Sequence, residues 1–128
     1  MLLLYVVEGI VPILVFQIAW AARLAWRQDK ERHKRIAAIH AASVWGSYVV
    51  SWILIYFGHT IPRKAPAWII DTHLVIIYII PVLLVFQMAT GLKGIRPVHI
   101  GLAAFYLILW AAALVTGAMI FLSGRGYI

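Results

Sequence analysis

The chain alternates between long apolar runs and short polar stretches. We place the runs at Met1–Trp26, Ile36–Phe57, Trp68–Gly91 and His99–Leu122. Each run holds about 20 residues or more, which is the length that crosses the hydrocarbon core of a bilayer as a helix. A helix is the expected conformation because lipid offers no partner to an open backbone. The pattern therefore predicts an all-α integral membrane four-helix bundle, in which residues 1–128 form a single transmembrane domain.

Composition supports the membrane assignment. Hydrophobic residues make up 65% of the chain and charged residues 12%, whereas a soluble domain is about half apolar and a quarter charged. The chain begins with LLLYVV after Met1, without a basic region before it, so we expect a retained helix rather than a cleaved signal peptide. There is no cysteine. This excludes disulfides, thiolate metal sites, iron–sulfur clusters and haem attached through cysteine.

The net charge of +7 is distributed unevenly. Most basic residues flank two loops, which we expect at residues 27–36 and 92–98. Short loops rich in Lys and Arg stay in the cytoplasm. We therefore expect both loops on the cytoplasmic side of a bacterial inner membrane and both termini in the periplasm. The basic residues then indicate topology and contact with anionic lipid rather than nucleic-acid binding.

Two segments of the chain resemble each other. PILVFQIAWAARLAWR at Pro12–Arg27 and PVLLVFQMATGLKGIR at Pro81–Arg96 share the triplet VFQ and run into basic residues. A histidine, His40 or His99, opens the apolar run that follows each segment. This pattern predicts two helical hairpins related by internal duplication, with chance similarity as the alternative. If duplication holds, His40 and His99 are equivalent and face each other across the bundle.

Facing imidazoles from two helices can ligate a haem iron or hold a copper ion. His40 and His99 are therefore candidate ligands for haem b or copper, with His73 contributing. Arg35 and Arg96 would flank the haem propionates. The alternative is that these histidines serve polar packing or lie at the membrane interface.

The remaining polar residues have structural as well as chemical interpretations. His59 and His73 form a second candidate metal pair, either for another haem or, with Asp71, for copper. Asp71 is otherwise expected to be a helix N-cap. We expect Gln17 and Gln87 to form hydrogen bonds between helices.

Several of these features resemble a known family, the short four-helix bacterial membrane proteins linked to assembly of haem–copper cytochrome c oxidase. The resemblance rests on HKRIAAIH at residues 33–40, THLVIIYIIP at residues 72–81, RPVHIG at residues 96–101 and the pair Thr116–Gly117. It implies a role in oxidase maturation, with His40, His73 and His99 as the functional positions. The paired histidines are also similar, more weakly, to those of small b-type cytochromes built on four-helix bundles.

Three classes of function follow from the sequence. The first is a component of a respiratory electron-transfer system that carries or handles haem b or copper. The second is a cofactor-free assembly factor or accessory subunit of a cytochrome oxidase or another membrane oxidoreductase. The third is a transporter or lipid-binding bundle, which at this size would form a homo-oligomer. This class ranks last because no charged residue lies deep in a segment. The chain shows no nucleophile–base pair or phosphate-binding loop, so we do not expect a stand-alone enzyme.

Overall fold

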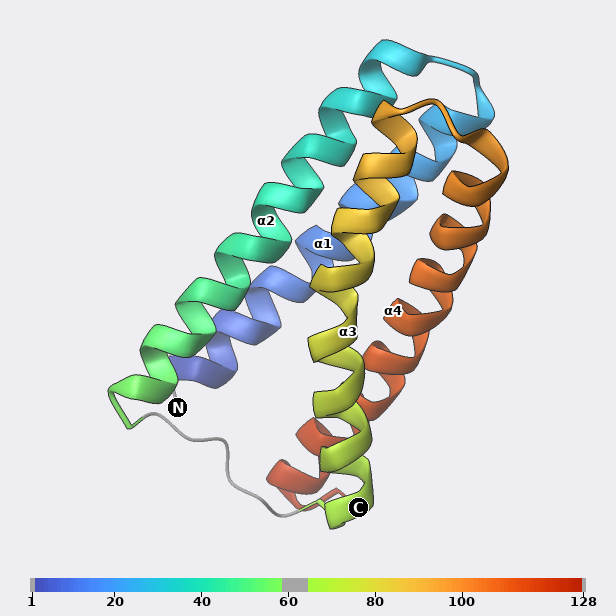
Figure 1. Cartoon of the computed structure of the whole chain (residues 1–128). Coiled ribbons are helices and arrows are strands. Elements are labelled where there is room, and N and C mark those ends of the chain that lie inside the picture. The colour runs from blue at the N-terminus through green and yellow to red at the C-terminus, as the bar shows by residue number, and fades with distance from the viewer. Residues whose placement is uncertain (1, 59–64, 128) are drawn as a thin grey trace. The chain divides into compact units, whose positions relative to one another are not determined.

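The computed structural model describes residues 2–58 and 65–127, with side chains from residue 9 onward. Its four helices, labelled in Figure 1, are α1 (Leu2–Trp26), α2 (Lys30–Tyr56), α3 (Ala67–Leu92) and α4 (Arg96–Arg125). Each helix is long and apolar enough to cross a membrane. The predictions of an all-helical chain and of four segments of membrane-spanning length are thus confirmed.

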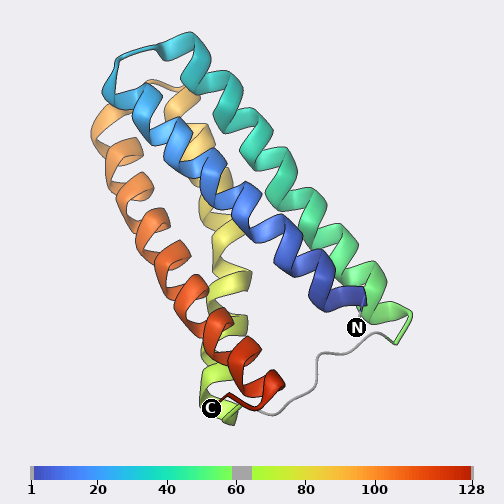
Figure 2. The same cartoon turned by 180° about the vertical axis from the view of Figure 1, so that it is seen from behind.

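The helices pair into two hairpins. Helix α1 packs on α2, and α3 packs on α4. The chain divides accordingly into two compact units, Met1–Ile61 and Pro62–Ile128. Figures 1 and 2 show from opposite sides that the two helices of each hairpin run antiparallel. The assembly of the two hairpins into one bundle stays a prediction.

Two helices begin earlier than predicted, α2 by six residues and α4, at Arg96 instead of His99, by three. Helix α2 begins at Lys30 instead of Ile36, so the loop before it is residues 27–29. The charged stretch is helical because Asp29 acts as N-cap, with its side chain accepting a hydrogen bond from the backbone N–H of Arg32 at 3.2 Å. Helix α3 begins after Pro66, so Asp71 lies inside the helix and the prediction that it is an N-cap is wrong.

The tight loops of the two hairpins have the same backbone conformation. Both are three residues long and contain a Schellman motif, in which the residue after the helix C-cap adopts a left-handed conformation. That residue is Gln28 in the first hairpin, with φ 58°, and Gly94 in the second, with φ 69°. Five backbone hydrogen bonds recur at an interval of 66 residues. They run from residues 27, 28, 29, 30 and 33 in the first hairpin and from residues 93, 94, 95, 96 and 99 in the second.

The same interval relates buried positions of the two hairpins. Leu14 corresponds to Ile80, His40 to Tyr106 and Val44 to Trp110, and all six side chains are buried. The counterpart of His99 at this interval is His33, so the prediction that His40 and His99 are equivalent is wrong. The VFQ triplets lead to another register because they align α1 with α3 by sequence similarity alone. The structural register depends instead on how far each residue lies from the tight loop of its hairpin.

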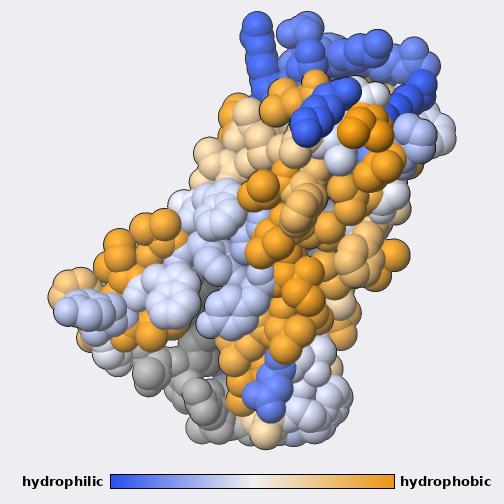
Figure 3. All heavy atoms as spheres, viewed as in Figure 1, coloured by the Kyte–Doolittle hydropathy of each residue, from blue (hydrophilic) through white to orange (hydrophobic). Residues whose placement is uncertain are grey.

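The surfaces of the helices suit a lipid environment. Large apolar side chains such as Phe16, Val49, Phe86 and Val115 are more than half exposed. Figure 3 shows extended hydrophobic surface along the helices and hydrophilic residues gathered at the loop end of the first hairpin. Hydroxyl groups bond to carbonyls of their own helix, as Ser51 does to Ser47 at 2.8 Å. Their hydrogen-bonding capacity is thereby met without water.

Candidate functional site: the histidine-lined seams of the two hairpins

Each hairpin holds a histidine in the fourth position of its second helix. Nδ1 of His33 lies 2.9 Å from the carbonyl oxygen of Ala21. Nδ1 of His99 lies 2.8 Å from the carbonyl oxygen of Gln87. A carbonyl oxygen only accepts, so Nδ1 carries the hydrogen in both rings. Each ring therefore ties the start of one helix to the penultimate turns of the other.

The second hairpin holds a further histidine nearer its open end. His73 lies in the second turn of α3, and its Nδ1 is 2.9 Å from Oγ1 of Thr116 on α4. The Thr116 hydroxyl donates to the carbonyl of Ala112 at 2.8 Å. The His73 ring and the Thr116 hydroxyl therefore join α3 to α4 by a side-chain hydrogen bond.

Glycines make room for both rings of the second hairpin. A Cβ built on Gly91 would lie 3.0 Å from Cε1 and Nδ1 of His99. A Cβ built on Gly117 would lie 3.2 Å from Cε1 of His73. The imidazoles therefore pack directly against the backbone of the neighbouring helix, as small residues allow in membranes.

The first hairpin contains a side-chain network around His40. Ser43 donates its hydroxyl hydrogen to Ile39 at 2.9 Å and so must accept from Nε2 of Gln17, at 3.1 Å. This orientation of the Gln17 amide turns its Oε1 toward His40, whose Nδ1 is 3.3 Å away. His40 is only 4% exposed. It lies three turns into α2, deeper than predicted, because the helix begins earlier.

These contacts give His33, His40, His73 and His99 one common arrangement. In each, Nδ1 forms a hydrogen bond with the other helix of the same hairpin. In His33, His40 and His99 the partner is a carbonyl or amide oxygen, so Nδ1 carries the hydrogen there. The prediction that Gln17 bonds between helices is confirmed. Gln87 accepts from His99 through its main chain, and its buried side-chain Oε1 accepts no hydrogen bond within the described part of the chain.

The structure places the other predicted site residues as follows. Arg35 is exposed in the second turn of α2, five residues before buried His40. At about 100° per residue, this spacing puts the two side chains on different faces of the helix. Arg96 is the exposed first residue of α4, one turn before His99. His59 lies outside the described residues. Asp71 is exposed on α3, and among the described side chains, those of residues 9–58 and 65–127, no three of His, Asp or Glu gather as a metal site. A meeting of His40 with His99 stays a prediction.

Sequence reasoning missed two members of these seams. The loop predicted at residues 27–36 includes His33, because a charged stretch is as compatible with a loop as with the start of an exposed helix. The signal for His33 is the spacing: basic residues stand at Arg27 and Lys30 and again 66 residues later, with a histidine after each pair. Thr116 is the partner of His73, and only the resemblance drew attention to it.

No family model, curated protein or solved structure matches the chain.

Proposed function

We propose that the protein is an integral membrane accessory or assembly subunit that acts without a cofactor of its own. The observation that carries this proposal is the shared engagement of the described histidines. In all four, Nδ1 forms a hydrogen bond across a hairpin seam, and two of the rings pack against a glycine. Hydrogen bonding between helices is therefore enough to explain why these histidines are present, without a bound haem or metal. This reverses the order of preference that the sequence alone suggests.

The partner in this proposal is a larger membrane oxidoreductase. The resemblance to proteins linked to cytochrome c oxidase assembly makes that oxidase the first partner to test. Helices with mostly exposed apolar faces are compatible with lipid and with helices of other subunits.

The test is deletion in the source cell. We expect loss of the protein to lower the amount of assembled oxidase, measured by activity and by haem absorbance of the membranes. Complementation should succeed with the wild-type chain and also with Arg125→Gln, which alters no described seam histidine. Unchanged oxidase in the deletion strain would rule out this partner.

The second candidate function is the handling of haem b or copper through His40, His73 and His99. It is favoured by the hydrogen bonds of Nδ1 to oxygen atoms, because ligating histidines commonly donate their other ring N–H to an oxygen acceptor. When bound, haem or copper would supply one-electron transfer. The chain's own residues would orient the rings through Gln17, Thr116 and the Gln87 carbonyl.

A visible absorption spectrum separates the two candidates. The accessory role predicts purified protein without a Soret band and without stoichiometric copper. A b-type spectrum that is lost in His40→Ala or His99→Ala, with helical content retained, would establish the second candidate instead. Metal analysis of the same sample tests copper.

The proposed topology places both tight loops in the cytoplasm, with the termini on the opposite side. Because the chain has no cysteine, an introduced cysteine is the only thiol that a maleimide can label, and its labelling shows on which side of the membrane it lies. We expect Gln28→Cys and Gly94→Cys to resist an impermeant maleimide added outside intact cells, and Tyr127→Cys to react. Labelling of the loop variants from outside would reverse the orientation.

A further inference from the structure

The loop end of the first hairpin carries a concentrated positive charge. Residues 23–35 hold six basic and two acidic side chains, a formal charge of +4. In the second hairpin, the structurally equivalent residues 89–101 hold two basic side chains and no acidic one, a charge of +2. Two basic positions are shared at the interval of 66, Arg27 with Lys93 and Lys30 with Arg96.

The other basic positions distinguish the hairpins. Positions 23, 32, 34 and 35 are basic in the first hairpin, and their counterparts are Ala89, Val98, Ile100 and Gly101. The backbone of the two loops is the same. The difference in charge therefore does not serve the turn itself. The first two turns of α2 form a charged extension, whereas α4 has no Asp, Glu, Lys or Arg between Arg96 and Arg125.

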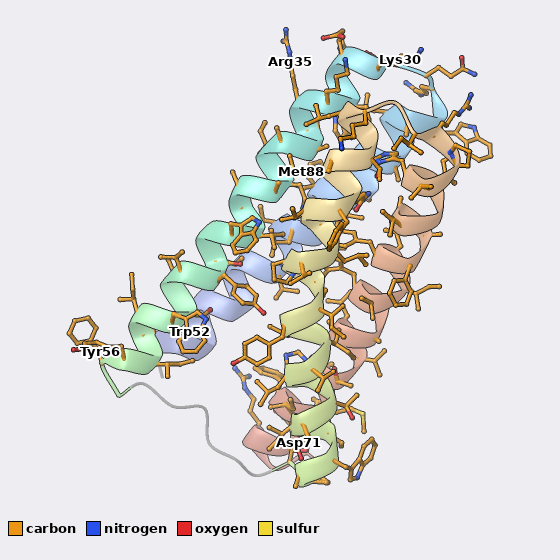
Figure 4. All side chains as sticks on the ribbon, viewed as in Figure 1. Lys30, Arg35, Trp52, Tyr56, Asp71 and Met88 are labelled. Atoms are coloured by element: carbon orange, nitrogen blue, oxygen red, sulfur yellow. The ribbon has the colours of Figure 1, made fainter. Side chains whose placement is uncertain are left out.

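Most of this charge is available to a partner. Arg32 lies 3.5 Å from Asp29 and Lys34 lies 3.5 Å from Glu31, both as exposed pairs of small energetic worth. In the described part of the chain, Lys30 and Arg35 have no carboxylate within ion-pair distance. Figure 4 shows both side chains pointing away from the helices at the loop end.

Aromatic residues lie at the same end. Trp26, the last residue of α1, is 90% exposed. The Arg23 guanidinium lies 5.8 Å from the ring centre of Trp20. Tryptophan beside exposed cations is the composition found where a helix leaves the hydrocarbon and enters the headgroup layer.

From this placement we infer that the start of α2 in the first hairpin, with Lys30 and Arg35 as its main contacts, binds the headgroups of anionic phospholipids. The inference rests on the proposed membrane location. Phosphate groups complement the charge, and clustered Lys and Arg next to a membrane span attract anionic lipid. The second hairpin, with half the charge, contributes less.

The experiment uses the full chain in phosphatidylcholine vesicles that contain spin-labelled phosphatidylglycerol or spin-labelled phosphatidylcholine. Electron spin resonance gives the relative association of the two labelled lipids. We compare the wild type with Lys30→Gln/Arg35→Gln and with Lys93→Gln/Arg96→Gln. The two variants remove the same number of charges from equivalent hairpins, and circular dichroism checks that both remain helical.

We expect the wild type to prefer phosphatidylglycerol. Neutralising Lys30 and Arg35 should lower that preference by up to about fivefold per cation at low salt, and neutralising Lys93 and Arg96 should lower it less. Salt should weaken the preference, because exposed charges are screened. Inorganic phosphate should act no more strongly than chloride at equal ionic strength; a stronger effect would indicate a site for a soluble anion and overturn the inference.

Two further outcomes separate this inference from the membrane proposal. Equal lipid preference in the wild type and in the Lys30/Arg35 variant, or an equal loss in both variants, would overturn the headgroup site alone. Release of the native protein from cell membranes by alkaline carbonate would overturn the membrane location itself.

Discussion

The ring of His99 fastens the second hairpin in the way that the ring of His33 fastens the first. In each, Nδ1–H donates to a carbonyl of the preceding helix, at 2.8 Å and 2.9 Å respectively. The two donors stand 66 residues apart and in the same position after loops of the same conformation. The repeated histidine therefore has a structural role, which is to join the two helices of each hairpin by a hydrogen bond.

His33→Ala and His99→Ala should each destabilise the protein. Loss of one interhelical hydrogen bond in a membrane costs about 0.5–1.5 kcal/mol. The free energy of unfolding in dodecyl maltoside, titrated with SDS, measures the effect. Val98→Ala, at a half-exposed neighbouring position, is the control. Histidine variants as stable as this control would contradict a fastening role.

The two glutamines of the VFQ triplets should differ. Gln17→Leu removes the partner of His40 and the donor to Ser43. We expect it to lower the free energy of unfolding by about 1–3 kcal/mol, because buried polar groups lose their hydrogen-bond partners. Gln87→Leu should cost less, because its Oε1 accepts no hydrogen bond in the described structure and His99 uses its main chain. SDS titration of both variants decides the question. An equal effect would show that the triplets act alike.

Gln28→Gly should stabilise the first hairpin. Gln28 has φ 58°, a conformation that costs a residue with a side chain about 1 kcal/mol relative to glycine. Gly94 already satisfies the same requirement in the second hairpin, so Gly94→Gln should lose a similar amount. The free energy of unfolding, measured by SDS titration, should rise in Gln28→Gly and fall in Gly94→Gln. A loss of stability in Gln28→Gly would show that the Gln28 side chain has a role of its own.

Gly91→Ala and Gly117→Ala should displace the rings of His99 and His73. The new Cβ would stand 3.0 Å or 3.2 Å from ring atoms, so packing strain of about 1–3 kcal/mol is expected. Gly46→Ala and Gly101→Ala are matched controls, since a Cβ there meets nothing within 4 Å. They should be neutral or stabilising by up to about 1 kcal/mol, because alanine favours a helix. Imidazole NMR shifts of the histidines would report ring movement in the first pair only.

The apolar pattern was sufficient to predict four helices of membrane-spanning length, because burial in lipid imposes helix on any long apolar segment. It misplaced the start of α2 by two turns, since Lys30 and Arg35 are as compatible with an exposed helix as with a loop. The interhelical use of Gln17 was also predictable, because a lone amide in an apolar helix needs a partner.

The partners of the histidines were not predictable in the same way. His40 meets Gln17 and His73 meets Thr116 across distances of 23 and 43 residues along the chain. Such pairs depend on the rotation and register of one helix against another, which the Schellman turns at Gln28 and Gly94 set. The spacing of residues in the sequence shows which side chains share a face of one helix. It does not show which side chains of the neighbouring helix that face contacts. The sequence by itself therefore determined the spans and the charge at their ends, and the tertiary structure decided which acceptor each imidazole binds.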